Sequence, residues 1–158
     1  MNILGMIKNR KRYNVDYSNE DKDARKITKI IVGLILVVVA VALFLPYLVG
    51  IHVELSATSI DIKAPLTSQK IDYSDIDTIE LVTEMPKSTR KIGLSSLGLE
   101  TGTYSCDEYG SYYRATYKEC LHFIVILRIS DSSYSVFNQK NEEMTTKLYQ
   151  DILAVLSN

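Results

Sequence analysis

The chain has 158 residues, is 46% hydrophobic and carries a formal net charge of −1 at pH 7. This near balance hides two opposite halves: residues 1–29 carry eight Lys or Arg and four acids, whereas residues 52–158 carry ten and fifteen. The basic stretch is short and interrupted by acids, so the composition gives no support to nucleic-acid binding.

An apolar run covers residues 30–51 and contains no Asp, Glu, Lys, Arg or His; sixteen of its 22 residues are Leu, Ile, Val or Phe. As an α-helix, such a run is about 33 Å long, against about 30 Å for the hydrocarbon core of a bilayer. A core helix of a globular protein would need a polar face, and this run has none. We therefore predict a single transmembrane helix over residues 29–51.

The charge asymmetry around this run predicts its orientation. Basic residues crowd its N-terminal flank, and the other flank has no Lys or Arg before Lys63. The positive-inside rule then predicts a cytoplasmic basic tail (residues 1–28), a single-pass anchor in the cell membrane and an extracytoplasmic domain (residues 52–158). A cleavable signal peptide fits less well, because the basic and apolar regions are both too long. Inverted topology remains the alternative.

The tail allows two interpretations. Apolar positions in residues 3–7, followed by the basic cluster at 8–12, would suit contact with an anionic inner leaflet. The interpretation we favour is a disordered tail whose charges only set the topology.

The remaining residues are enough for one small domain with its own core. β-Branched and aromatic residues predict a mostly-β fold, and a repeat of apolar residues predicts one C-terminal helix opening at Asn141. The expected strands are 53–62 with a turn at 57–59, then 76–82, 112–117, 121–129 and 134–137, with a hairpin turn at 131–133. The expected apolar stripe of the helix is Met144, Leu148, Ile152 and Val155, widened by Leu153 and Leu156. Such an order of elements predicts a small barrel or sandwich with the helix closing one end.

Scattered motifs in this domain resemble the bacterial PH-like (pleckstrin-homology-like) domain family. They are a Y-x-D-I turn, a Pro-Lys-x-x-Arg segment with a glycine-bearing loop, a Y-x-F-N strand and a T-x-x-L-Y helix. In this chain these are Tyr73, Asp75 and Ile76; Pro86, Lys87, Arg90, Gly93 and Gly98; Tyr134, Phe137 and Asn138; and Thr145, Leu148 and Tyr149.

The resemblance covers residues 51–154 and implies a PH-like fold: a bent seven-stranded antiparallel sheet, or partly open barrel, closed by a C-terminal helix. Many members join the domain to N-terminal membrane helices. Phosphoinositide-binding PH domains carry a basic cluster between their first two strands, and the corresponding turn at 56–59 has no Lys or Arg here. The resemblance therefore implies a binding module without implying phosphoinositide recognition.

The sequence predicts no enzyme, no cofactor and no metal site. It contains no G-x-S-x-G, H-E-x-x-H, P-loop or G-x-G-x-x-G motif, and its two histidines, His52 and His122, lie far apart. Asp72, Asp75 and Asp77 superficially suggest a calcium loop, but the glycine and final glutamate of an EF-hand are missing. Capping of a turn and a solvated strand face are the better interpretation of these acids.

Cys106 and Cys120 are the only cysteines and lie outside the membrane in the predicted topology. If the segment between them is a hairpin, they could face each other and form a disulfide closing a loop of about 15 residues. The alternative is two free thiols.

Two sets of residues are candidates for an interaction surface. Lys87, Arg90 and Lys91 form a basic patch on a predicted loop, which would bind an anionic lipid or polymer of the envelope or else remain solvated. The tyrosines are a second surface, because tyrosine is enriched at interfaces: Tyr104, Tyr109, Tyr112 and Tyr113. The leading hypothesis is thus a non-catalytic membrane protein whose PH-like domain binds a protein partner or a second copy of itself. The alternative is an envelope sensor that binds an anionic ligand through residues 87–91.

Overall fold

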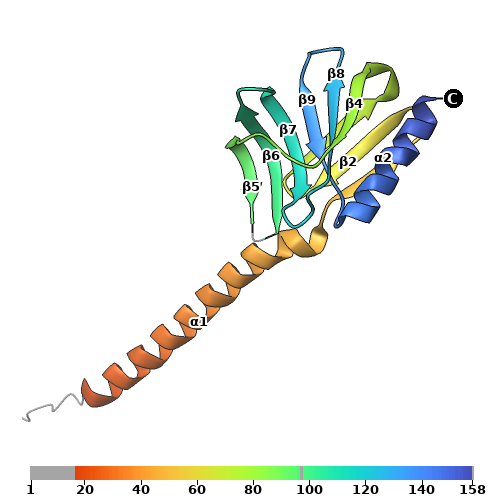
Figure 1. Ribbon diagram of the computed structural model, residues 1–158. Coiled ribbons are helices and arrows are strands. Elements are labelled where there is room, and N and C mark those ends of the chain that lie inside the picture. The colour runs from red at the N-terminus through yellow and green to blue at the C-terminus, as the bar shows by residue number, and fades with distance from the viewer. Residues whose placement is uncertain (1–16, 97, 158) are drawn as a thin grey trace, which may run out of the picture. The chain divides into compact units, whose positions relative to one another are not determined.

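The computed structural model describes residues 17–96 and 98–157 (Figure 1). The chain divides into two compact units, residues 1–40 and residues 41–158. Helix α1 (Tyr17–Val49) belongs partly to each of them. Its stretch Ala24–Leu45 has a mean hydropathy of 2.9, and none of it is buried within the protein. The chain therefore has a helix long and apolar enough to cross a membrane.

The boundaries of this helix differ from the predicted ones. Of the predicted tail, residues 1–16 lie outside the described residues, with the apolar and basic positions at 3–12 among them, and residues 17–28 are part of α1. At the other end the helix stops at Val49, and Ile51, expected to be its last residue, is 3% exposed in the core of the domain. An apolar residue satisfies a membrane span and a protein core equally well, so hydropathy alone could not place this boundary.

Unit 2 carries two β-sheets and a C-terminal helix. The smaller sheet is antiparallel, in the order β1 (His52–Leu55), β2 (Ser59–Ala64), β3 (Thr67–Asp72). A short 3-10 turn, η2 (Tyr73–Asp75), leads into the larger sheet. The order of that sheet is β4 (Ile76–Val82), β8 (Phe123–Arg128), β9 (Tyr134–Phe137), β7 (Gly110–Tyr117), β6 (Leu99–Cys106), β5 (Thr89–Ser95).

This architecture confirms the predicted mostly-β domain with a C-terminal helix, and neither sheet closes into a barrel. It differs from the seven-stranded sheet that the resemblance implies, because the described strands form one sheet of three and one of six. Every pair is antiparallel except β7 with β9. The predicted hairpin turn at 131–133 joins β8 and β9 as expected.

The main core fills the space between the two sheets. Alternate residues of each strand point to one face of a sheet, so the six-stranded sheet has an inner face toward the smaller sheet and an outer face away from it. Aliphatic residues and one phenylalanine fill the space against the inner face, nearly all of them fully buried: Ile51, Ile60, Ile62, Ile71, Leu99, Ala115, Ile124, Ile126, Phe137 and Ile152. At about 25 cal/mol per Å² of buried apolar area, this cluster is the main source of stability.

Helix α2 (Glu142–Leu156) closes this core from one side. Asn141 caps it, since the Asn141 side chain accepts a hydrogen bond from the Met144 amide at 2.9 Å. Ile152 is fully buried and Leu148 packs beside it, as predicted, but Met144 is 48% exposed and the buried residue of the first turn is Thr145. The predicted stripe is therefore wrong at its first position, because hydrogen bonds of the Thr145 hydroxyl fix that turn. It is also wrong at its C-terminal end, where Leu153, Val155 and Leu156 are exposed.

Asn138 explains the polar end of the Y-x-F-N motif. It is fully buried, its Oδ1 accepts a hydrogen bond from the Tyr117 amide at 2.6 Å, and its Nδ2 donates to the carbonyl oxygens of Tyr117 and Cys120. A buried amide with all these partners satisfies the backbone where β7 ends. The motif is thus structural.

The outer face of the six-stranded sheet is covered differently. Strands β4 and β5 lie at opposite edges of the sheet, yet only residues 83–88, the crossing segment, join them (Figure 1). Met85 of this segment packs on a second cluster, made of Tyr104, Tyr112, Phe123, Val125 and Val136. The outer face is therefore rich in aromatic rings and covered by one extended stretch of chain.

Candidate interaction surface

The most exposed structural element of the domain is β5. It forms an edge of the six-stranded sheet, and all of its residues are exposed except Leu94, which is half-buried. Ile92 has 77% of its surface exposed. An edge strand presents unpaired backbone N–H and C=O groups, which can pair with a strand of another chain.

A pair of glycines brings β5 close to β6. Gly93 and Gly102 lie opposite each other in the register, with φ angles of +131° and +123° that favour glycine. A Cβ atom on either residue would overlap the backbone of the other strand. The predicted glycine-bearing loop is wrong for Gly93, which lies on β5, whereas Gly98 does lie in the connection between β5 and β6. Two glycines on facing strands permit a close approach of the two paired backbones.

The three residues of the predicted basic patch are exposed, but two of them lie on a strand and not on the predicted loop. Arg90 and Lys91 lie on β5, and only Lys87 lies in a connection, the crossing segment. All three are exposed, and no ion pair joins any of them to an acid within the described residues. Lys87 and Lys91 line one shallow pocket of about 380 Å³, together with Thr89, Ser105, Cys106 and Asp107.

The predicted tyrosine surface is mostly buried. Tyr104 and Tyr112 are 4% and 1% exposed in the outer cluster, and Tyr113 packs against the inner core, on the opposite face. Burial raises the pKa of Tyr113 to about 12. Among the four predicted residues, Tyr109 alone joins the outer surface as a half-buried ring. Neighbouring strand residues alternate between faces, which is why a run of tyrosines cannot form one surface.

Arg114 holds the outer face together, although no sequence motif marks this residue. Its guanidinium forms an ion pair with Glu100 at 2.8 Å and lies 5.2 Å from the ring centre of Tyr104. It also donates hydrogen bonds to Ser88 of the crossing segment at 3.1 Å and to Thr116 at 3.0 Å. The arginine is therefore the polar link between the sheet and the segment that covers it.

A small hollow of about 200 Å³ opens on the same face, near the turn that joins β6 and β7. Its lining consists of Thr78, Glu80, Glu108, Tyr109, Val125 and Tyr134. The rings of Tyr109 and Tyr134 lie 4.5 Å apart, and burial raises the pKa of Tyr109, with the two glutamates adding to the effect. This end of the outer face is thus acidic and aromatic, whereas β5 is basic.

The structure contradicts the predicted disulfide. Cys106 pairs with Gly110 at the start of β7, and Cys120 follows the end of that strand, so roughly 20 Å of extended chain separates them. A disulfide requires Cα atoms within about 7 Å. Both thiols are free: Cys106 accepts a hydrogen bond from the Tyr109 amide, and the buried Cys120 contacts the Thr145 hydroxyl. The hairpin turn lies at 107–109, directly after Cys106, and not midway between the two cysteines as the disulfide would require.

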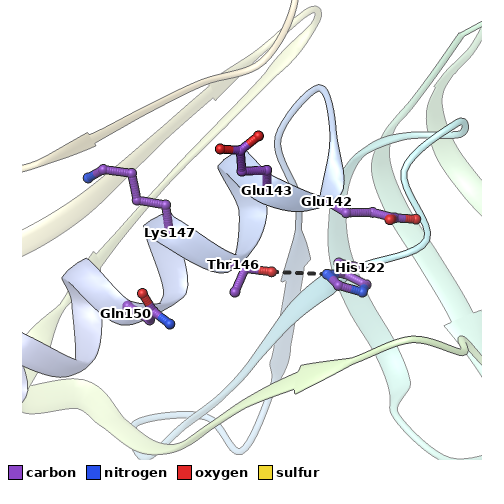
Figure 2. Close-up of a pocket in the computed structure, with 6 residues that line it drawn as sticks. All are labelled: His122, Glu142, Glu143, Thr146, Lys147 and Gln150. Atoms are coloured by element: carbon purple, nitrogen blue, oxygen red, sulfur yellow. Dashed lines mark hydrogen bonds between the residues drawn. The ribbon is translucent and has the colours of Figure 1, made fainter.

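A third hollow lies between His122 and α2 (Figure 2). It measures about 450 Å³ and is lined by His122, Glu142, Glu143, Thr146, Lys147 and Gln150. The His122 Nδ1 is hydrogen-bonded to the Thr146 hydroxyl at 3.0 Å, and the two glutamates complement the N-terminal end of the helix dipole. The hydrogen bond between the imidazole and the hydroxyl joins the connection before β8 to α2.

Two of the remaining polar candidates, Asp75 and His52, make contacts within the fold. Asp75 accepts hydrogen bonds from Arg128 and from the amide and hydroxyl of Ser130, and the Arg128 guanidinium is the main reason why its pKa is lowered. Asp72 and Asp77 are exposed. His52 contacts the Val49 carbonyl oxygen at 2.8 Å, at the end of α1. Within the described residues no group of three His, Cys, Asp or Glu side chains could hold a metal ion.

Comparison with known proteins agrees with this geometry. The family model described as "Bacterial PH domain" matches residues 51–152, which is more than half of the chain. No curated protein and no solved structure matches the chain. The match begins at Ile51, where the core begins, and ends at Ile152, the last fully buried residue of α2. The chain therefore belongs to the bacterial PH domain family.

Proposed function

We propose that this chain is a single-pass membrane protein that presents its PH domain outside the cytoplasmic membrane as a non-catalytic module for binding a protein partner. The observation that carries the proposal is the exposed edge of β5, Thr89–Ser95. Strand addition at such an edge supplies main-chain hydrogen bonds, and neighbouring side chains supply specificity. The excess of basic residues before the apolar helix supports the outward orientation of the domain.

Site-specific photo-cross-linking tests the partner. A photoreactive amino acid is placed at Ile92, in the exposed edge, and at Ser132, in the β8–β9 turn, as the control. We expect a discrete cross-linked product from position 92 that the control lacks. The partner identified from it should then bind the purified chain. An Ile92→Pro variant should lose that binding while it keeps its circular dichroism spectrum; equal cross-linking from both positions would contradict the edge as the site.

Thiol labelling tests the orientation separately. In a Cys106→Ser, Cys120→Ser background, single cysteines replace Ser132 in the domain or Asn9 in the tail. A membrane-impermeant maleimide added to intact cells should label the cysteine at position 132 and leave the one at position 9 unlabelled. The reverse pattern would place the domain in the cytoplasm.

A second candidate function rests on Lys87, Arg90 and Lys91. These exposed cations have no acidic partner in the described part of the chain, and two of them share a pocket. They suit an anionic envelope lipid or polymer. Charge reversal of all three to Glu should abolish co-sedimentation with phosphatidylglycerol vesicles and binding of soluble polyphosphate. Loss of vesicle binding alone would indicate a lipid, loss of both a general polyanion site, and unchanged binding would end the idea.

A further inference from the structure

The core of the domain begins two residues after α1 ends. The helix ends at Val49, and Ile51 is already part of the core. Gly50 between them has a φ of +70°, and a Cβ atom there would lie 2.6 Å from the Tyr117 hydroxyl oxygen. That hydroxyl accepts a hydrogen bond from the Ile51 amide at 2.9 Å. The end of the domain that contains Tyr117, here called the junction end, is thus tied to the point where the chain enters.

Chain length keeps the junction end close to the bilayer if α1 spans it. The candidate span Ala24–Leu45 ends five positions before Gly50. Even fully extended, five residues reach at most about 18 Å, and as helix they reach about 7.5 Å. Side chains that project from the junction end therefore lie within reach of the membrane surface, whatever the angle between helix and domain.

The β2–β3 hairpin turns at this same end. Antiparallel pairing matches His52 with Lys63 and Ala64 with Thr67, so only Pro65 and Leu66 form the turn. If the pairing of His52 with Lys63 is continued by two residues along both strands, Gly50 lies opposite Pro65. The turn is therefore level with Gly50. The Thr101 hydroxyl donates a hydrogen bond to the Pro65 carbonyl oxygen at 2.8 Å, which fixes the turn to the larger sheet.

Leu66 is an unusual residue for such a turn. Its φ of +65° lies in the left-handed region, where glycine and asparagine are usual and leucine is disfavoured. Its side chain is 83% exposed, more than any other large apolar residue of the described chain. A hairpin tip that only faces water gains nothing from a leucine. Leu121, which is 59% exposed, adds a second apolar side chain in the connection that follows Tyr117.

From this arrangement we infer that Leu66 and Leu121 enter the interfacial layer of the bilayer that α1 crosses, so that the domain docks on the membrane by its junction end. The ligand is the lipid bilayer, because both side chains are apolar and the chain tethers them beside an apolar helix. The inference rests on the membrane anchoring in the proposed function. It adds that the domain is held in a defined orientation, which would leave the opposite end, with the β8–β9 turn, facing away from the membrane.

The chain has no tryptophan, so single tryptophans report their own surroundings. We would place Leu66→Trp, Leu121→Trp and Ser132→Trp variants of the full chain in lipid nanodiscs, with and without lipids brominated near the glycerol end of the acyl chain. Ser132 is the matched control for Leu66, since it is exposed at a hairpin tip with a φ of +53°. A Val39→Trp variant in α1 reports membrane insertion of the helix itself.

We expect blue-shifted emission and strong quenching by brominated lipid for Leu66→Trp and Leu121→Trp, and neither for Ser132→Trp. Red, unquenched emission from both leucine positions would overturn the inference. A blue shift without quenching would overturn it in favour of a protein partner or second copy, and equal quenching at Ser132 would overturn the end-on orientation. Unquenched Val39→Trp would refute the membrane anchor of the proposed function itself. If one leucine variant does not fold, the other carries the test.

Discussion

The two faces of the six-stranded sheet are built on different principles. The inner face packs mostly aliphatic side chains, nearly all of them fully buried, against a second sheet and α2. The outer face packs tyrosines under residues 83–88, and the Tyr104 and Tyr112 hydroxyls there are buried without a hydrogen-bond partner in the described structure. The inner face therefore holds the larger buried core, whereas the outer face and the neighbouring β5 edge carry the aromatic and charged groups that the proposed binding would use.

Truncation of one residue on each face tests this contrast most strongly. Phe137 and Tyr134 lie on the same strand, β9, and point to the inner and outer face respectively. Phe137→Ala should lower the free energy of unfolding by about 3–5 kcal/mol, because a fully buried ring leaves a cavity. Tyr134→Ala should cost clearly less, since its ring is half-buried. Denaturant unfolding of the full chain in detergent micelles measures both values, and equal losses would contradict the distinction between the faces.

The next largest effect concerns the close approach of β5 and β6 at Gly93 and Gly102. Gly93→Ala combines an unfavourable φ with overlap of the Thr101 backbone, so we expect a loss of at least about 1–3 kcal/mol in the free energy of unfolding. Gly110→Ala is the matched control, because Gly110 also has a positive φ but has open space around it. The same unfolding measurement should rank Gly93→Ala as clearly the more damaging change. The reverse order would mean that the close approach of the two glycines is not needed to hold the edge strand.

Arg114 attaches the crossing segment to the outer face of the six-stranded sheet. Arg114→Leu removes the ion pair with Glu100 and the hydrogen bond to Ser88, and should cost about 1–2 kcal/mol. Because the lost contacts hold the crossing segment, hydrogen exchange should accelerate in residues 83–88 while α2 keeps its protection. An exposed arginine, Arg90, gives the control: Arg90→Leu should change neither quantity. Uniform acceleration throughout the domain would show that Arg114 supports the whole fold.

The smallest expected effect is a pH dependence of the free energy of unfolding, caused by Asp75 in the turn before β4. The pKa of Asp75 is lowered, mainly by its hydrogen bond to Arg128, so its carboxylate stabilises the folded state above the unfolded-state pKa. This contribution should be lost as pH falls through the lower, folded-state pKa. Asp75→Asn should remove that part of the acid dependence. Thermal unfolding of both proteins between neutral and acidic pH checks this, and parallel curves would contradict it.

Local patterns predicted the elements whose residues repeat regularly. The apolar helix, β4, β8, β9 and α2 were all expected near their observed positions. Strands β3, β5 and β6 were not predicted, because Ser, Thr, Gly and charged residues interrupt their apolar alternation. The family resemblance compensated for this at the level of the fold, but it could not show which strand lies at the edge of a sheet.

For the candidate site, the sequence identified the basic residues and failed on the tyrosines and cysteines. Whether Tyr104 or Tyr112 is exposed depends on the crossing segment that covers them, and the distance from Cys106 to Cys120 depends on β7 running between them. Arg114 had no local signal at all, since its contacts come from other strands and from the crossing segment.

The sequence by itself determined that the chain has an apolar helix long enough for a bilayer, followed by one mostly-β domain with a terminal helix, because hydropathy and periodicity are properties of neighbouring residues. The tertiary structure alone decided that β5 is a free edge, that Ile51 belongs to the core and that Leu66 projects beside the entry of the chain. These features depend on pairing between residues distant in the sequence, and such pairing is set by the packing of the whole domain.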